Sequence, residues 1–190
     1  MPKLYFRYGA MNSSKTANLL MVAHNYESQD KKVVLIKPKI DNRFGDNIIK
    51  SRSGIEKEAN LVIEQDFDLY ENFFIKLNNN LPNIILVDEA NFLTSKQVDQ
   101  LRIISMKIPV IAYGLRTDYK TKLFEGSKRL MEIADSIEEI KTICNYCDTK
   151  AIINMKHNNG KSVKDGSDVP DLGCENKYLA VCWKCWINSN

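Results

Sequence analysis

The sequence predicts an α/β fold: a parallel sheet with helices on both faces, followed by a small C-terminal module stapled by a metal ion. Apolar strands alternate with helical segments over most of the chain, as in sheets covered on both sides. A loop with the frame G-x-x-x-x-S-K-T follows the first strand, and two C-x-x-C pairs lie near the C-terminus. We expect residues 1–143 to form the main domain and residues 144–190 the module.

The first half of the main domain begins with a strand, a loop and a helix. Residues 3–8, "KLYFRY", are predicted to form the strand, and Lys15 to about Ser28 the helix. "VVLIK" (33–37) is a second buried strand, stopped by Pro38. The polar stretch 39–60 is interpreted as one exposed functional loop.

The second half continues the alternation. Residues 69–79 look helical, and "IILVD" (84–88) and "VIAYG" (110–114) are continuous apolar strands of the kind that parallel sheets bury. Thr94 lies between them at a suitable N-cap position, and the helix that it starts must end before Pro109.

Composition fits an ordinary soluble globular protein. The 190 residues suffice for one core of usual size and a small appended module. Hydrophobic residues make up 44%, and no apolar run reaches the length of about 18 residues that suggests a membrane span. "MPKLYFRYGA" lacks the apolar core of a secretory signal, so we expect a cytoplasmic protein. A net charge of +3 is too small to argue for nucleic acid as a partner.

The stretch "YGAMNSSKT" (8–16) has the frame of a phosphate-binding loop. In such a loop, backbone N–H groups turn inward around the phosphates, Lys supplies charge, and Ser or Thr binds Mg²⁺. Gly9, Lys15 and Thr16 hold those places, whereas Ser14 replaces the second glycine. Serine reaches the left-handed backbone region at a cost of roughly 1–2 kcal/mol, which weakens the match without excluding it. Alone, the loop also fits a chance turn; with the features below it predicts a P-loop NTPase-like domain.

A second part of the site is predicted at the end of "IILVDEA". P-loop folds hold the Mg²⁺ shell with an acidic residue after a neighbouring buried strand, and Asp88 fits that role. Glu89 follows it toward the same cleft, where a carboxylate can accept a proton from an attacking hydroxyl. By itself an acidic turn is often only solvated. In combination with Lys15 and Thr16, it favours a nucleotide site.

The cysteines give the most specific signal. "CNYC" (144–147) and "CWKC" (182–185) supply two C-x-x-C pairs, the pattern of a tetrahedral Cys₄ zinc site. Redox dithiols and buried free cysteines are the alternatives. A closed Cys₄ site is structural, and it would hold the intervening segment, which has few apolar residues of its own. The ligands are predicted to be Cys144, Cys147, Cys182 and Cys185.

Two further cations lie in the long loop after the second strand. Arg43 is in "DNRFG" and Arg52 in "SRSG". A charge in a polar loop is usually only solvated, but phosphoryl transfer needs cations beyond the P-loop lysine. The loop leaves the sheet at its carboxyl edge, where open α/β folds bind ligands.

Taken together, these parts resemble the thymidine kinases that carry a zinc-stapled lasso, in their bacterial form and related to the human cytosolic type. The resemblance covers nearly the whole chain. It is carried by the following stretches, in the family's order and spacing: "YGAMNSSKT", "DNRFG", "SRSG", "VDEANFL", "YGLRTDYKTKLF", "CNYC" and "ENKYLAVCWKC".

The resemblance implies transfer of the γ-phosphoryl of ATP to the 5′-hydroxyl of thymidine. It makes Glu89 the general base, places Asp88 on the Mg²⁺ side and puts Arg43 near the transferred phosphate. The ATP phosphates would be cradled by Gly9, Ser13, Ser14, Lys15 and Thr16. The apolar thymine pocket would be formed by Met11, Phe92, Leu115, Tyr119 and Phe124.

The resemblance also implies features beyond the chemical step. The segment from Leu172 through Gly173 to Tyr178 resembles the lasso, whose backbone reads the thymine edge while Tyr178 closes over the substrate. Homotetramers are common in the family, and many members are inhibited by dTTP. We therefore expect thymidine and ATP as ligands, dTTP as feedback inhibitor, structural zinc, and neither nucleic acid nor membrane as partner.

The sequence departs from the family pattern at a few positions. Ser14 replaces a glycine, Asn91 a glutamine, Asn154 a frequent threonine, and Cys174 a lasso glycine. None removes a charge that the chemistry uses. The alternative from another class is a DNA-dependent P-loop ATPase with a zinc ribbon, which predicts a basic stripe, whereas the net charge is near neutral and the lasso-like segment is not basic enough to favour it. A non-catalytic zinc-ribbon protein would not need Lys15, Thr16 and the acidic pair together.

Overall fold

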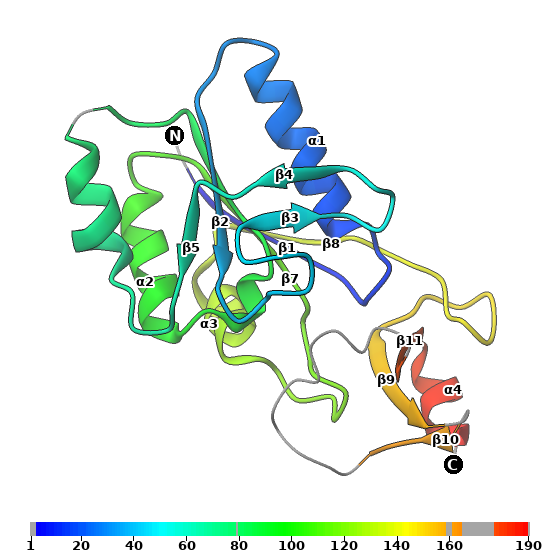
Figure 1. Cartoon of the computed structure of the whole chain (residues 1–190). Helices are drawn as coiled ribbons and strands as arrows, with labels where there is room; N and C mark the ends of the chain where they lie inside the picture. The colour runs from blue at the N-terminus through cyan, green and yellow to red at the C-terminus, as the bar shows by residue number, and fades with distance from the viewer. Residues whose placement is uncertain (1–2, 79, 159–160, 165–176, 190) are drawn as a thin grey trace.

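The computed structural model describes residues 3–78, 80–158, 161–164 and 177–189. Its centre is a six-stranded parallel sheet in the order β5-β2-β6-β7-β1-β8 (Figure 1). The strands are β1 (Leu4–Tyr8), β2 (Val33–Pro38), β5 (Leu61–Ile63), β6 (Ile84–Val87), β7 (Val110–Gly114) and β8 (Ser136–Glu139).

Both faces of the central strands are buried, and residues alternate between two cores. On one face Phe6, Ile36 and Val87 pack with helices α2 (Ser95–Ile104) and α3 (Glu125–Ile133). On the other face Leu35, Leu86 and Tyr113 pack against helix α1 (Lys15–Glu27). Figure 1 shows α1 on the opposite side of the sheet from α2 and α3. The predicted sheet with helices on both faces is confirmed.

Helix α2 begins as predicted. The Thr94 hydroxyl accepts a hydrogen bond from the Gln97 backbone N–H, and the Gln97 side chain accepts one from the Thr94 N–H, which completes a capping box. A short 3₁₀ helix, η3 (Ala90–Phe92), connects β6 to this cap. The segment predicted as helical near 69–79 contains a π-helical turn, η1 (Tyr70–Phe74), and a 3₁₀ turn, η2 (Ile75–Leu77).

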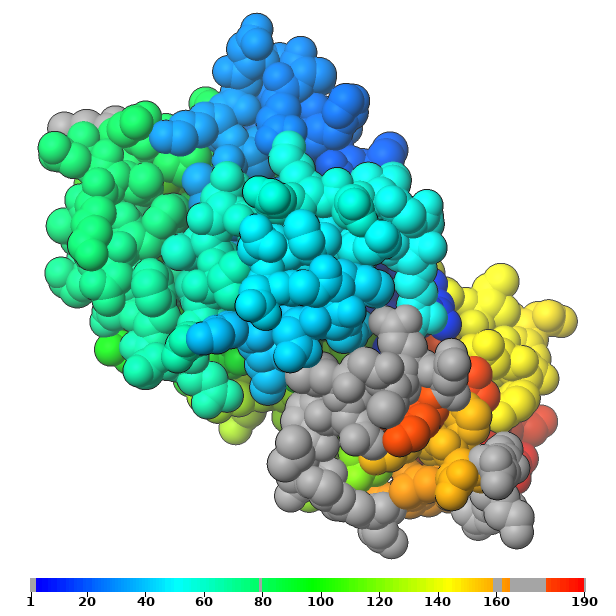
Figure 2. All heavy atoms as spheres, viewed as in Figure 1, coloured from blue at the N-terminus to red at the C-terminus, as the bar shows by residue number. Residues whose placement is uncertain are grey.

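The interpretation of 39–60 as a single exposed loop was wrong. It contains an antiparallel hairpin of β3 (Ile48–Lys50) and β4 (Glu56–Glu58), and Ile49 is buried in the α1 core. Strands of three residues are too short for their alternation to be separated from a loop. In Figure 2 the cyan hairpin lies between helix α1 (blue) and the C-terminal module (orange and red). Strands β5 and β8 and helix α3 were not predicted either.

The C-terminal module has more regular structure than its sequence suggested. Strands β9 (Ile153–Asn158), β10 (Lys161–Ser162) and β11 (Tyr178–Val181) pair antiparallel in the order β10-β9-β11, and helix α4 (Trp183–Asn188) ends the module. The module lies beside the main sheet in Figure 1. Among the described residues, none of the helices is long and apolar enough to span a membrane.

Candidate active site

The P-loop lies at the carboxyl end of β1 and leads into α1. A Cβ atom at Gly9 would lie 2.4 Å from both the Ile140 carbonyl oxygen and the Ser13 hydroxyl, so this position has no room for a side chain. Ser14, the N-cap residue of α1, has φ 61° and ψ 27°. The serine therefore adopts the left-handed conformation that a glycine would take without strain.

The Lys15 ammonium lies inside this loop. It donates hydrogen bonds to the carbonyl oxygens of Ala10 at 2.8 Å and Gly9 at 3.2 Å, and to the Ser13 hydroxyl at 3.4 Å. Burial lowers the pKa of Lys15 to about 8, although the nearby Glu89 and Asp88 raise it in part. An anion in the loop would therefore favour the charged form of the lysine.

Asp88 and Thr16 bring two kinds of oxygen together at the base of the site. The Thr16 hydroxyl lies 3.3 and 3.2 Å from the two carboxylate oxygens of Asp88. Burial, followed by the charge of Glu89, raises the pKa of Asp88 to about 7. A hydroxyl beside a carboxylate fits the preference of Mg²⁺ for oxygen ligands.

Glu89 occupies a strained position directly after β6. Its φ of 47° is left-handed and non-glycine, a conformation that is enriched at functional sites. One carboxylate oxygen accepts a hydrogen bond from Arg43 Nη2 at 2.6 Å, and Arg43 Nε donates to Asp41 at 2.6 Å. Burial opposes the charge on Arg43, but Glu89 and Asp41 outweigh it, so the pKa of the guanidinium lies above its ordinary value.

A single cavity of about 550 Å³ joins the phosphate loop to an apolar wall. On the loop side, Ser14, Lys15 and Thr16 line it, with Arg43 and Glu89 nearby. Phe92 and Phe124 meet edge to face on the apolar side, with ring centroids 5.7 Å apart. Tyr119 and Tyr178 also contact each other edge to face, at 6.5 Å. All the predicted pocket residues within the described ranges line this cavity: Met11, Phe92, Leu115, Tyr119, Phe124 and Tyr178.

Three predicted residues stand behind the wall of the cavity. Gly9 and Ser13 accept hydrogen bonds from Lys15. Asp88 is buried and accepts a hydrogen bond from Thr16, which does line the cavity. Leu172 and Gly173 of the predicted lasso lie outside the described residues, so only the Tyr178 end of that segment is placed.

Some wall residues had no assigned role. Asn154 of β9 accepts a hydrogen bond from the Met11 N–H at 2.7 Å and donates to the Thr117 carbonyl at 3.2 Å, so it joins the module to the P-loop. The turn of the β3–β4 hairpin contributes Ser51 and Ser53 together with Arg52, the second cation that the sequence analysis singled out. Asn154 was noticed only as a departure from a family pattern, because one polar residue in a strand carries no signal of a long-range contact.

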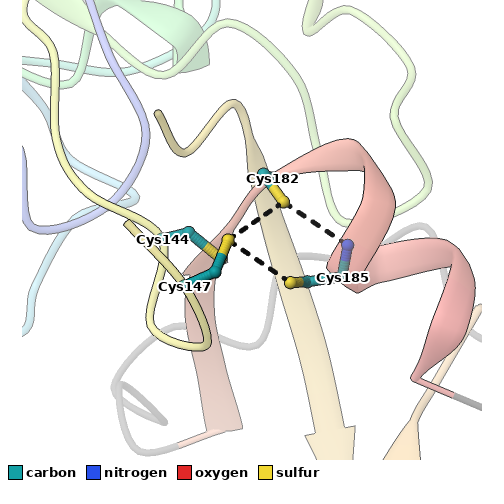
Figure 3. Close-up of side chains that lie close together, drawn as sticks. All are labelled: Cys144, Cys147, Cys182 and Cys185. Atoms are coloured by element: carbon teal, nitrogen blue, oxygen red, sulfur yellow. Dashed lines mark hydrogen bonds between the residues drawn. The ribbon is translucent and has the colours of Figure 1, made fainter. Parts of the chain in front are cut away.

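The four predicted zinc ligands converge in the C-terminal module. Their sulfur atoms all lie within 4.8 Å of one another, and Cys147 Sγ is 3.7 Å from Cys182 Sγ and 3.6 Å from Cys185 Sγ. Figure 3 shows the four side chains pointing toward a common centre. A tetrahedron with Zn–S bonds of about 2.3 Å has S···S edges of about 3.8 Å, so the cluster fits zinc. Cys144 and Cys182 are also buried in the core of the module.

This fold and this cavity define a P-loop protein in which a module with a Cys₄ cluster completes an apolar pocket beside the phosphate loop. A family model described as thymidine kinase matches residues 2–186. The chain belongs to the thymidine kinase family, as its motifs indicated. It is a kinase that phosphorylates thymidine, and the DNA-dependent ATPase alternative has no comparable support.

Curated relatives extend over the same length. A thymidine kinase of Streptococcus pyogenes serotype M28 is 43% identical over 190 residues, which cover 99% of this chain and 98% of that protein. One from Lactiplantibacillus plantarum is 45% identical over 184 residues, covering 96% and 94%, and one from Streptococcus gordonii is 44% identical over 186 residues, covering 97% and 95%. A solved DNA replication initiation factor superposes with a TM-score of only 0.40 at 14% identity, over 73% of this chain and 40% of that one, and does not bear on the assignment.

Proposed function

We propose that the single cavity carries out the whole reaction: the P-loop holds the ATP phosphates, the aromatic wall holds thymidine, and Glu89 lies between them. The observation that carries this proposal is the continuity of the cavity from Lys15 to Tyr178. Phosphoryl transfer needs donor and acceptor in line, and one continuous space permits that arrangement.

On the donor side, Gly9, Ser13 and Ser14 shape the loop, and Lys15 exchanges its carbonyl partners for phosphate oxygens. Thr16 and Asp88 would hold Mg²⁺, which neutralises charge on the phosphates when bound. The close approach of the Thr16 hydroxyl to both Asp88 oxygens supports this assignment. Arg43 faces the same space and adds positive charge near the transferred group.

On the acceptor side, Glu89 takes the proton from the 5′-hydroxyl. A bond forms between the 5′-oxygen and the γ-phosphorus, while the bond from that phosphorus to the β,γ-bridging oxygen breaks. The products are dTMP and ADP. The hydrogen bond from Arg43 restricts the Glu89 carboxylate to one orientation, which supports its role as a positioned base.

The thymine ring would lie against Met11, Phe92, Leu115, Tyr119 and Phe124, with Tyr178 closing from the module. Leu172 and Gly173 are proposed to complete the pocket through their backbone groups. Zinc at the four cysteines would fix the turn at residues 144–147 and the end of β11, and β11 in turn carries Tyr178. The metal supplies structural constraint there and takes no part in the chemical step.

We further propose dTTP as a feedback inhibitor, a homotetrameric assembly, a cytoplasmic location, and a domain boundary between residues 143 and 144. The boundary is supported by strands β9 to β11, which pair only with one another in the described part of the chain, and by the four clustered cysteines, all of which lie after residue 143. The length of the cavity supports dTTP, because its thymidine part and its phosphates match the two ends.

The activity is tested by ADP release from purified protein with Mg-ATP. Reactions contain no acceptor, thymidine, another nucleoside, or single-stranded DNA. We expect thymidine to stimulate release, with dTMP formed in equal amount. Stimulation by DNA, or ADP release without dTMP, would contradict the proposal.

A further inference from the structure

Lys37 is a buried lysine that the proposed reaction does not use. It stands near the carboxyl end of β2, and only 1% of its surface is exposed. Its ammonium donates hydrogen bonds to the carbonyl oxygens of Ile48 at 2.8 Å and Gly45 at 3.4 Å. A lysine is almost never buried without a specific partner, so these contacts need a reason.

The third partner of Lys37 is Asp41, which is also buried. Lys37 Nζ lies 3.8 Å from Asp41 Oδ2, while Asp41 Oδ1 accepts the hydrogen bond from Arg43 Nε. The Asp41 carboxylate thus bridges two cations with its two oxygens. Arg43 then reaches Glu89 at 2.6 Å. The chain of contacts runs from Lys37 through Asp41 and Arg43 to the proposed base.

Lys37 also fixes the backbone that follows Arg43. Gly45 follows the arginine by two residues and Ile48 is the first residue of strand β3, and the ammonium donates a hydrogen bond to the carbonyl oxygen of each. Lys37 therefore holds the Asp41–Gly45 loop through both the Asp41 carboxylate and the backbone carbonyl of Gly45. Because guanidinium groups bond in a fixed planar fork, a small displacement of this loop would misalign Arg43 with Glu89.

We propose that Lys37 is a positioning residue for phosphoryl transfer, which acts by holding the Asp41–Gly45 loop so that Arg43 faces Glu89. The proposal rests on the roles proposed above for Arg43 and Glu89. Lys37 does not line the cavity, so we expect its substitution to change turnover and not thymidine binding.

A double-mutant cycle in the full chain tests this role. Lys37→Met keeps the length of the side chain and removes its charge, and Arg43→Lys removes the guanidinium fork. We expect Lys37→Met to lower kcat by about 10- to 100-fold, in the range of a 1 Å misplacement, with the KM for thymidine changed less than about twofold. In the Arg43→Lys background, Lys37→Met should lower kcat by a further factor of less than about three, because the contact that Lys37 supports is already lost.

Lys39→Met is the matched control, since Lys39 lies two residues further along, is exposed and pairs with Glu64 outside the cavity. It should keep wild-type kinetics. If Lys37→Met does not fold, Lys37→Arg, which keeps the charge with different donor geometry, takes its place in the cycle with a smaller but again non-additive loss.

The outcomes separate two failures. If Arg43→Lys keeps wild-type turnover, the proposed role of Arg43 fails and the inference with it. If Arg43→Lys is impaired but Lys37→Met leaves kcat unchanged, the inference alone is overturned. The same holds if the loss of kcat in the double variant equals the product of the two single losses. A KM effect without a kcat effect would also overturn it, because that is the signature of altered substrate binding.

Discussion

At the scale of single residues, Glu89 combines a strained backbone with a charge held in place. Its left-handed φ and its hydrogen bond to Arg43 fix the carboxylate at the mouth of the P-loop. We predict that Glu89→Gln lowers kcat by about 10²–10⁴-fold, the usual contribution of a general base, while ATP binding stays near normal. Steady-state kinetics with calorimetric ATP titration test this. Near-normal turnover would exclude Glu89 as the base.

Ser14 shows what a missing glycine costs. Its left-handed conformation carries a penalty of roughly 1–2 kcal/mol for a residue with a Cβ, partly offset because glycine is more flexible in the unfolded chain. Its side chain makes no capping hydrogen bond that would compensate. We predict that Ser14→Gly raises the melting temperature and does not weaken ATP binding. Ser14→Ala, which keeps the Cβ, should show no such gain, and an equal gain in both variants would refute the explanation.

Asp88 makes stability depend on pH. Its folded-state pKa, about 7, lies above the ordinary value of 3.8, so the folded protein binds the proton more tightly than the unfolded chain. Stability of the nucleotide-free protein should therefore fall as pH rises from about 4 to about 7. We predict that Asp88→Asn flattens this fall and melts higher than wild type at pH 7, with the difference vanishing toward pH 4. Melting curves in chelator across this range test it, and parallel curves for both proteins would contradict it.

The residues themselves show which contacts the sequence could predict. Lys15, Thr16 and Asp88 were found because each follows an apolar strand in a known frame, and a parallel sheet brings such strand ends together. The network of Lys37, Asp41 and Arg43 could not be found that way. A lysine at the end of an apolar strand is usually solvent-exposed, and only the fold of the following loop shows that Lys37 is buried.

At the scale of elements, prediction depended on length. Strands β2, β6 and β7 were predictable because a short continuous apolar run is typical of a buried strand. The three-residue strands β3, β4 and β5 are too short to show such a pattern. The sheet of β9 and β11 was missed because the two strands are about 20 residues apart in sequence, and no local pattern indicates such a distant pairing. This module supplies Asn154 and Tyr178 to the cavity.

We predict that Cys147→Ser reduces bound zinc from one per chain to nearly none and weakens thymidine binding by at least about tenfold, because the strand that carries Tyr178 ends directly before Cys182, one of the proposed zinc ligands. ATP binding, which depends on the P-loop, should change far less. Metal analysis and calorimetry with each ligand measure this. The fifth cysteine is the control, since Cys174→Ser should keep its zinc. Normal thymidine affinity in a zinc-free protein would contradict the link.

At the scale of the whole molecule, two units meet at one cavity. The main sheet provides the phosphate loop and the acidic pair, while the module provides part of the apolar wall and, through Asn154, a hydrogen bond to the P-loop backbone at Met11. The two ends of the cavity are therefore connected by direct contact as well as by shared space. A ligand that spans both ends should be sensed by both units at once.

A nucleotide that carries thymidine and a triphosphate meets that description. We predict that dTTP inhibits the enzyme and competes with thymidine and with ATP, because one bound molecule fills the aromatic wall and reaches the P-loop. Initial rates at varied ATP, thymidine and dTTP test this. The matched control is dCTP, which has the same phosphates and sugar but a different base, and should inhibit much less. Equal inhibition by both nucleotides would assign the effect to the phosphates alone. Inhibition by dTTP that excess thymidine does not relieve would place its site outside this cavity.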